Sequence, residues 1–159
     1  MSNPSPLARP FAFYVATLLF FGVGCITTIG LNWYAGLTLP SWAPPNLAAA
    51  AAWFVLFFTT ATSAVAYWNR APHTGRIFGW VLALYVVNSF LVLLWDYLFF
   101  GVHKLGAAFG VAALVGATVI GLMTLLWKDE RKPAVLLAPY LLWMVFALIF
   151  TYEVMVLNP

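Results

Sequence analysis

Five long apolar blocks constrain what this chain can fold into. They cover residues 11–31, 47–68, 77–100, 105–127 and 134–157. A helix needs roughly 20 apolar residues to cross a bilayer core about 30 Å thick, and each block is about that long. The strands of a membrane barrel would instead show blocks of about ten residues with alternating polarity. The blocks therefore predict an all-α integral membrane protein, folded as a bundle of five transmembrane helices.

The composition leaves little room for anything outside the bilayer. Hydrophobic residues make up 65% of the 159 residues and charged residues 7%, against about 45–50% and about 25% in soluble domains. We therefore expect a single membrane domain over residues 1–159, with the lipid bilayer as its surroundings. The net charge of +3 is scattered over several connections, so nucleic acid is not an expected partner. His103 has no second His or Cys at ligand spacing, and neither a metal site nor another cofactor is predicted.

The basic residues predict the orientation of the bundle. Along a path of five helices, six of them fall on one side: Arg9, Arg70, Arg76, Lys128, Arg131 and Lys132. Only Lys104 falls on the other side. Because Lys and Arg near helix ends are retained in the cytoplasm, the N-terminus should be cytoplasmic and the C-terminus should lie on the opposite face.

The connection over residues 32–46 is uncharged and rich in proline and aromatic residues. Proline fixes φ and lacks an N–H donor, so the segment cannot be helical throughout, and we expect a stiff cap over one end of the bundle. An alternative is an ordinary interfacial belt, in which Trp and Tyr lie at headgroup depth because their rings are amphipathic.

Three motifs carry a family resemblance. The connection reads W-Y-x-x-L-x-x-P-x-W-x-P-P from Trp33 to Pro45, and Trp53 follows it. The third block ends W-D-Y-L-F-F-G at Gly101, and the fifth contains P-Y-L-L-W-M-V-F-A from Pro139. In these motifs the chain resembles the tryptophan-rich sensory proteins, also called translocator proteins or the TspO/MBR family.

The resemblance implies a five-helix bundle, often dimeric, with a pocket beneath the first connection for tetrapyrroles such as porphyrins, for sterols or for synthetic aromatic ligands. Flat rings stack on Trp faces, which explains an aromatic pocket. By motif position, the implied ligand-binding residues are Trp33, Tyr34, Trp42, Trp53, Phe57, Val92, Trp95, Trp143 and Ala147.

The chain also departs from the family pattern. Phe57 stands where a Tyr is usual, Val92 where an Asn is usual, and Tyr97 replaces a proline. A ligand that needs hydrogen bonds from the missing groups would lose about 1 kcal/mol for each. The departures favour a polyene, isoprenoid or sterol-like ligand over a carboxylate-rich porphyrin.

Two acidic residues, Asp96 and Glu153, lie within apolar blocks. A carboxylate at the centre of a membrane helix costs about 2.5–3.5 kcal/mol, so such residues usually face a cavity. Both lie near the non-cytoplasmic ends of their blocks, and we expect them in one layer under the cap. They would act there as an acid and base pair on a double bond, or as polar anchors for a hydroxylated lipid. Alternatively, each extends to the interface or pairs locally.

Small residues line one face of the fourth block: Gly106, Gly110, Ala113, Ala117 and Gly121. Small faces let two helix backbones approach closely in lipid. This face should contact either a neighbouring helix of the same bundle or the partner in a homodimer.

Two functions remain open from the sequence. The first is a membrane-embedded binding or sensory protein that holds a hydrophobic ligand, a tetrapyrrole, sterol, isoprenoid or polyene, beneath residues 32–46. The alternative is a small membrane enzyme that cyclises or isomerises an isoprenoid or polyene, with Asp96 and Glu153 as acid and base.

The charge distribution makes the first testable prediction. Reporter fusions at Ser2 and Pro159 should give a cytoplasmic signal at the N-terminus and the opposite signal at the C-terminus, because basic residues stay inside. Both ends reporting the same side would contradict the count of five spans.

Overall fold

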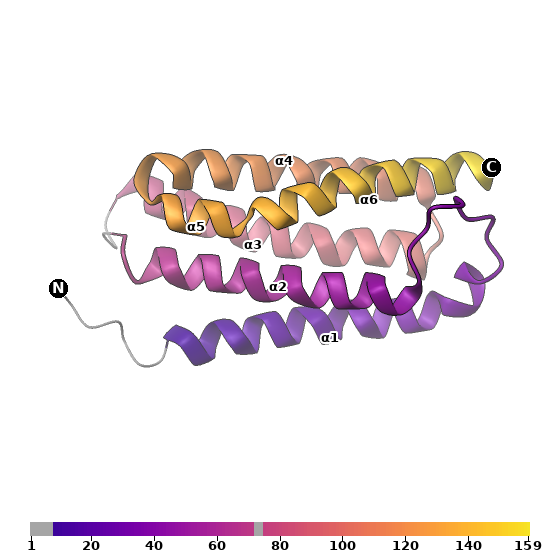
Figure 1. Cartoon of the computed structure of the whole chain (residues 1–159), viewed down its shortest axis with the longest axis horizontal. Coiled ribbons are helices and arrows are strands. Elements are labelled where there is room, and N and C mark those ends of the chain that lie inside the picture. Colours follow the sequence, from indigo (N-terminus) through magenta and orange to yellow (C-terminus); the bar gives the residue numbers. More distant parts are fainter. Residues whose placement is uncertain (1–7, 72–74) are drawn as a thin grey trace.

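The computed structural model describes residues 8–71 and 75–159, apart from the side chains of residues 8–18, 20 and 21. These ranges contain helices and connections and no strand. The elements are α1 (Ala8–Tyr34), α2 (Asn46–Trp68), α3 (Arg76–Asp96), the π-helix η1 (Tyr97–Gly101), α4 (Leu105–Asp129), α5 (Arg131–Leu136) and α6 (Ala138–Leu157). The long helices lie side by side and successive ones run in opposite directions (Figure 1). The most extensive contacts join α3 to α4, α1 to α2, and α4 to α6.

Length and composition mark four helical stretches within the described ranges as candidate membrane spans: Asn46–Trp68, Arg76–Gly101, Leu105–Asp129 and Arg131–Leu157. Their outer faces carry large apolar side chains, such as Leu47, Val86 and Leu142, which are 83%, 69% and 73% exposed. A water-soluble monomer rarely exposes so much contiguous apolar surface. The chain is an integral, multi-pass, all-α membrane protein. The predicted span 11–31 falls in α1, and many of its side chains lie outside the described part.

Two predicted boundaries differ from the structure. Trp33 and Tyr34 form the last turn of α1, so the connection between α1 and α2 covers residues 35–45. The predicted helix 134–157 is divided at Leu137 into α5 and α6. Pro139 explains the division, because its ring has no N–H and collides with the carbonyl four residues earlier.

The division of the last helix creates a contact with α2. The N–H of Leu137 turns to the carbonyl of Ala134, and the carbonyl of Pro133 instead accepts a hydrogen bond from Ser63 Oγ at 2.6 Å. Ser63 also bonds Tyr85 Oη on α3 at 2.7 Å. One buried hydroxyl thus joins three elements.

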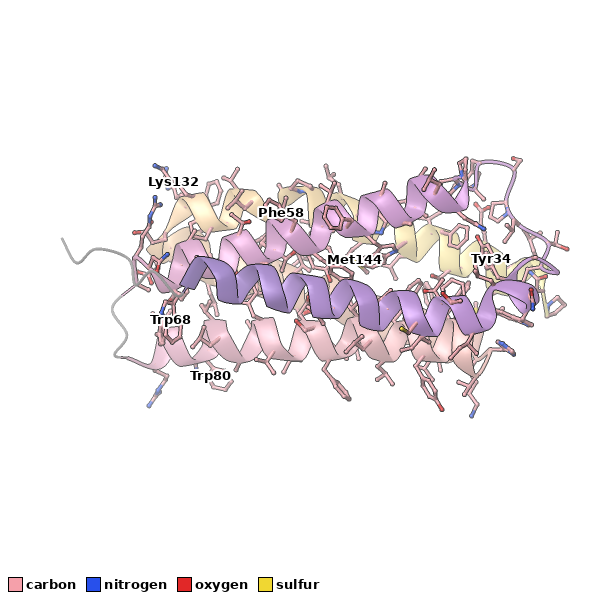
Figure 2. The ribbon with its side chains drawn as sticks, turned by 90° about the horizontal axis from the view of Figure 1, so that it is seen from below. Tyr34, Phe58, Trp68, Trp80, Lys132 and Met144 are labelled. Carbon is pink, nitrogen blue, oxygen red and sulfur yellow. The ribbon has the colours of Figure 1, made fainter. Side chains whose placement is uncertain are left out.

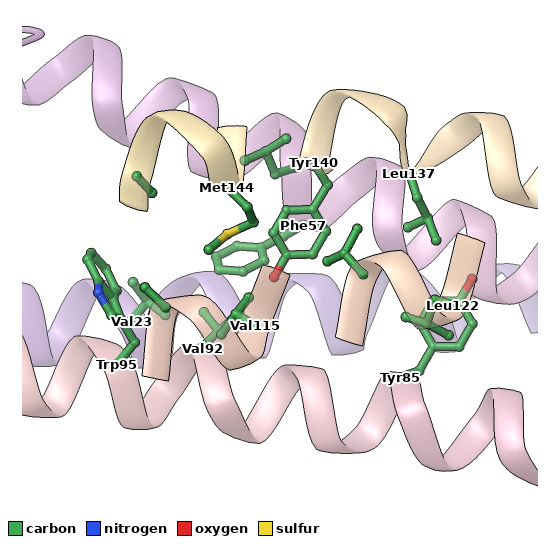
Figure 3. Packing of buried hydrophobic residues seen from close by; sticks show 14 of the residues in the cluster. Val23, Phe57, Tyr85, Val92, Trp95, Val115, Leu122, Leu137, Tyr140 and Met144 are labelled. Atoms are coloured by element: carbon green, nitrogen blue, oxygen red, sulfur yellow. The ribbon is translucent and has the colours of Figure 1, made fainter. Parts of the chain in front are cut away.

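A second polar group joins the middle of the bundle. The Asn88 side chain on α3 donates to Thr118 Oγ1 on α4 at 2.8 Å, and its Oδ1 accepts from Tyr140 Oη on α6 at 3.0 Å. Tyr140 belongs to the same buried cluster as Val115 and Met144 (Figure 3). Such bonds hold helices together where lipid offers no partners.

The small face of α4 points away from the bundle. Gly106, Gly110, Ala113 and Ala117 are exposed, and Gly121 is half-buried. The opposite face of α4 packs against α3 and α6 through residues such as Ala108, Ala112 and Val119, which are fully buried.

The π-helix η1 lies close to the backbone of α1 at Gly30. A Cβ at Gly30 would overlap the Phe100 carbonyl oxygen and lie 2.8 Å from the Phe100 Cβ. Only a glycine permits this approach, which places Thr27, one turn earlier on α1, against the end of α3.

Replacing Gly30 with Ala should therefore force α1 away from η1. We expect a loss of about 1–3 kcal/mol of stability, the usual cost of overpacking, measured as a lower unfolding temperature of the detergent-solubilised protein by circular dichroism. Gly79→Ala is the matched control, because a Cβ at this helical glycine meets nothing within 4 Å. Equal unfolding temperatures for the two variants would contradict the close approach.

Candidate ligand cavity

A cavity of about 450 Å³ lies between α1, α2, α6 and the junction of α3 with η1. Its walls are almost entirely apolar and aromatic. The volume falls within the range of about 300–1,000 Å³ that is usual for small-molecule sites. Pro44 of the connection and Tyr34 at the end of α1 line the end of the cavity that is nearest the connection. The cavity therefore lies at the same end of the bundle as Tyr34, opposite to Trp80 and Lys132 (Figure 2).

Three tryptophans from three different helices meet at the cavity wall. The Trp53 ring on α2 lies 5.9 Å from the Trp95 ring on α3 and 6.1 Å from the Trp143 ring on α6. Trp143 also contacts Phe146, with ring centroids 4.8 Å apart. These spacings are those of favourable aromatic pairs, and the rings present flat apolar faces to whatever occupies the cavity.

The structure places the predicted site residues in three groups. Those that line the cavity are Tyr34, Trp53, Trp95, Asp96, Trp143 and Ala147. Two others, Phe57 and Val92, line a smaller cavity of about 70 Å³ together with Tyr85, Asn88 and Tyr140. Phe57 follows Trp53 by four residues and Val92 precedes Trp95 by three, so both lie about one helical turn further from the connection.

Trp33 and Trp42 form the third group, outside the cavity lining. The Trp33 ring stacks on the imidazole of His103, with centroids 4.0 Å apart and planes 14° from parallel. His103 adopts a φ of 59°, a left-handed conformation that His tolerates better than most residues. Trp42 packs edge-on against Phe146 and Phe150, which do line the cavity. Trp42 thus packs against the cavity wall from outside, whereas Trp33 packs against His103 and Phe99, which do not line the cavity.

Asp96 is the carboxylate of the cavity. It is fully buried, and its Oδ1 accepts a hydrogen bond from Thr27 Oγ1 on α1 at 2.8 Å. Its Oδ2 has no hydrogen-bond partner. Thr27 also lines the cavity, although the sequence analysis did not single it out. The available signal for Thr27 was a polar residue inside an apolar block, three residues before Gly30.

Glu153 has a different environment from Asp96. Its Oε2 accepts a hydrogen bond from Trp42 Nε1 at 3.1 Å, and Glu153 is not among the residues that line the cavity. The two carboxylates therefore have separate partners. Asp96 bonds Thr27 on α1, and Glu153 bonds Trp42 on the connection. Glu153 holds the connection against the end of α6.

Asn158 provides a second attachment for the connection. Its Oδ1 accepts from the Thr38 N–H at 2.9 Å, and its Nδ2 donates to the Thr38 carbonyl at 3.0 Å. The same nitrogen reaches the carbonyl of Val154 at 2.8 Å. The connection rises beside the C-terminal end of α6 (Figure 1). The C-terminal part of α6 and Asn158 thus hold the connection by hydrogen bonds at two residues, Thr38 and Trp42.

Comparisons with known proteins give one consistent result. The sequence profile of the TspO/MBR family matches residues 12–157. Protein CrtK of Rhodobacter capsulatus is 30% identical over 92% of this chain and 91% of its own length. A translocator protein of Ovis aries is 31% identical over 84% and 79%. A tryptophan-rich sensory protein of Cereibacter sphaeroides is 30% identical over 80% and 77%.

The attachment through Asn158 leads to a prediction about the connection. Asn158→Ala removes both bonds to Thr38, so amide exchange at the Thr38 N–H should rise by roughly fivefold, since a net hydrogen bond stabilises by about 1 kcal/mol. Hydrogen exchange of peptides that cover residues 35–45, read by mass spectrometry, measures it. Asn69→Ala, at the opposite end of α2, should leave these peptides unchanged. Unaltered exchange in the Asn158→Ala variant would mean that the attachment does not hold the connection.

Proposed function

Because the chain belongs to the TspO/MBR family, we propose that it is a membrane-embedded binding or sensory protein for a hydrophobic ligand. The ligand occupies the cavity beneath residues 35–45, and the candidate classes are tetrapyrroles, sterols and isoprenoids or polyenes. One relative is named a sensory protein, in keeping with a function that needs binding and no chemical step.

One observation supports this proposal above the others. Trp53, Trp95 and Trp143 come from three helices and meet around a single apolar cavity of about 450 Å³. A structural core would fill such a space with side chains, because interiors are packed to the density of organic crystals. A preformed aromatic cavity instead suits a ring or conjugated chain that stacks on indole faces.

The membrane topology is part of the proposal. We infer that α1, 27 residues long, is a fifth span beside the four candidate spans, and that residues 1–159 form one domain. The charged groups at one end of the bundle support a cytoplasmic location of that end. Arg70 lies 3.6 Å from Glu130 there, and Arg131 lies over the Trp127 ring. The cavity would then face the opposite side of the membrane.

We also propose a homodimer through the exposed small face of α4, formed by Gly106, Gly110, Ala113, Ala117 and Gly121. A Cβ at Gly110 would meet nothing within 4 Å, so at the centre of this face the bundle does not use the close approach that small residues permit. A second copy of the same face is its simplest partner.

The enzymatic alternative has less support. An acid and base pair needs both carboxylates within reach of one substrate atom. Asp96 bonds Thr27 at the cavity, whereas Glu153 bonds Trp42. The separate partners favour binding without chemistry.

The proposed function predicts that Trp143→Ala weakens ligand binding by about 1–3 kcal/mol, because stacking and contact area are both lost. Intrinsic fluorescence titrations with protoporphyrin IX, dehydroergosterol and all-trans-retinol measure the affinity for one compound of each class. Trp80→Ala is the matched control, since Trp80 is 60% exposed and lies at the other end of the bundle. Equal affinities for the two variants would remove Trp143 from the site.

A further inference from the structure

The end of the bundle opposite the connection carries an excess of basic groups. Its described basic side chains are all exposed: Arg70, Arg76, Lys128, Arg131 and Lys132. Its acidic side chains are Asp129 and Glu130. Three of the basic residues, Lys128, Arg131 and Lys132, stand close together in the sequence where α4 passes into α5, and they form the basic junction of this bundle.

Both acidic side chains at this end already have partners from the end of α2. The Tyr67 hydroxyl donates to Asp129 Oδ2 at 3.2 Å, and Arg70 Nη1 lies 3.6 Å from Glu130 Oε2. The other two of the four acidic residues in the chain lie toward the opposite end, where they bond α1 and the connection. Within the described ranges, the basic junction therefore has no carboxylate as an ion-pair partner. Its charge is available to an anion from outside the chain.

Tryptophan side chains indicate that the basic junction lies at the depth of lipid headgroups. The Arg131 guanidinium lies 5.6 Å from the centroid of the Trp127 ring, which is exposed. Two further exposed tryptophans, Trp68 and Trp80, lie at the same end of the bundle as Lys132 (Figure 2). Trp rings concentrate at the boundary between membrane and water. Cations beside them are at the level of the lipid phosphate groups.

The surface next to the basic junction is apolar. Beyond Lys132, the outward side of α5 and α6 carries exposed apolar side chains at Val135, Leu142, Val145 and Ile149. This side is thus cationic where α5 begins and apolar further along the bundle. A phospholipid with a net negative charge has the complementary division, an anionic head on apolar chains.

We propose that the basic junction binds the headgroup of an acidic phospholipid, whose acyl chains lie along the outward side of α5 and α6. Lys and Arg form short, charge-assisted hydrogen bonds with phosphate oxygens. A zwitterionic lipid brings its own cation beside the phosphate, so it gains less from three basic groups. The site lies at the other end of the bundle from the ligand cavity, and it does not depend on the function proposed for that cavity.

The test offers the full chain in detergent equal amounts of two lipids with the same acyl chains, palmitoyl-oleoyl phosphatidylglycerol and palmitoyl-oleoyl phosphatidylcholine. Native mass spectrometry measures how much of each lipid stays bound. The unmodified protein should retain about tenfold more of the acidic lipid, because basic groups near the membrane surface each favour an anionic lipid.

Lys132→Gln removes one charge of the basic junction and should lower this preference by about threefold to fivefold. Lys104→Gln is the matched control, since Lys104 is an equally exposed lysine at the opposite end of the bundle. It removes the same charge from the chain and should leave the preference unchanged. The triple variant Lys128→Gln, Arg131→Gln and Lys132→Gln should retain the two lipids equally.

Glycerol 3-phosphate tests whether the acyl chains take part. It offers a phosphate group without chains, so about a tenfold molar excess over the acidic lipid should leave the bound lipid in place. Displacement by this compound would mean that the basic junction binds a soluble phosphate and that the lipid assignment is wrong.

Two further outcomes would overturn the proposal. One is equal retention of the two lipids by the unmodified protein. The other is an equal loss of preference in the Lys132→Gln and Lys104→Gln variants, which would show that net charge attracts the lipid without a site at the basic junction.

Discussion

A bilayer offers no hydrogen-bond partners, and the arrangement of this bundle follows from that constraint. Each polar side chain in the membrane has to find its partner on another helix or on its own backbone. Ser63 reaches α3 and the freed carbonyl of Pro133, and Asn88 reaches α4 and α6. These bonds connect helices that apolar packing alone would leave free to slide, because lipid tails are as apolar as leucine.

The same constraint applies at the two cavities. Around Asn88 four residues from three helices form a connected set of hydrogen bonds. Thr60 Oγ1, which lines the same small cavity, has no partner. Around Asp96 the chain satisfies one carboxylate oxygen through Thr27 and leaves the other unpaired, and two indoles of the same lining are also unpaired. Unpaired polar atoms therefore occur at both cavities, and it is the aromatic lining of the main cavity, together with its volume, that supports a binding site.

The sequence predicted those features that depend on one segment at a time. Block length predicted the helices, and the family motifs predicted that Trp53, Trp95 and Trp143 belong together. The sequence did not reveal side-chain contacts between two helices. The bond from Thr27 to Asp96 depends on the approach of Gly30 to η1, and no local pattern reveals that approach.

Other differences between the prediction and the structure depend on how far along the bundle a residue lies. Phe57 and Val92 occupy motif positions, yet one helical turn carries them from the main cavity to the smaller one. No local pattern reveals the role of Asn88, because its partners Thr118 and Tyr140 are distant in sequence. The family match shows membership, and two of the departures from its pattern, Phe57 and Val92, fall at the smaller cavity.

For the proposed ligand, selection from within a membrane would depend more on polar contacts than selection from water. The cavity reaches exposed residues of α1 and α2, including Gly24, Leu31 and Leu47, while Asn158 and Glu153 fasten its cover. An apolar molecule arriving between these helices leaves lipid, not water, and gains little from burying its apolar surface. Shape and stacking on the tryptophans then act together with the few polar atoms to distinguish one lipid from another. Thr27 and Asp96, joined by a hydrogen bond at 2.8 Å, are polar residues of this lining.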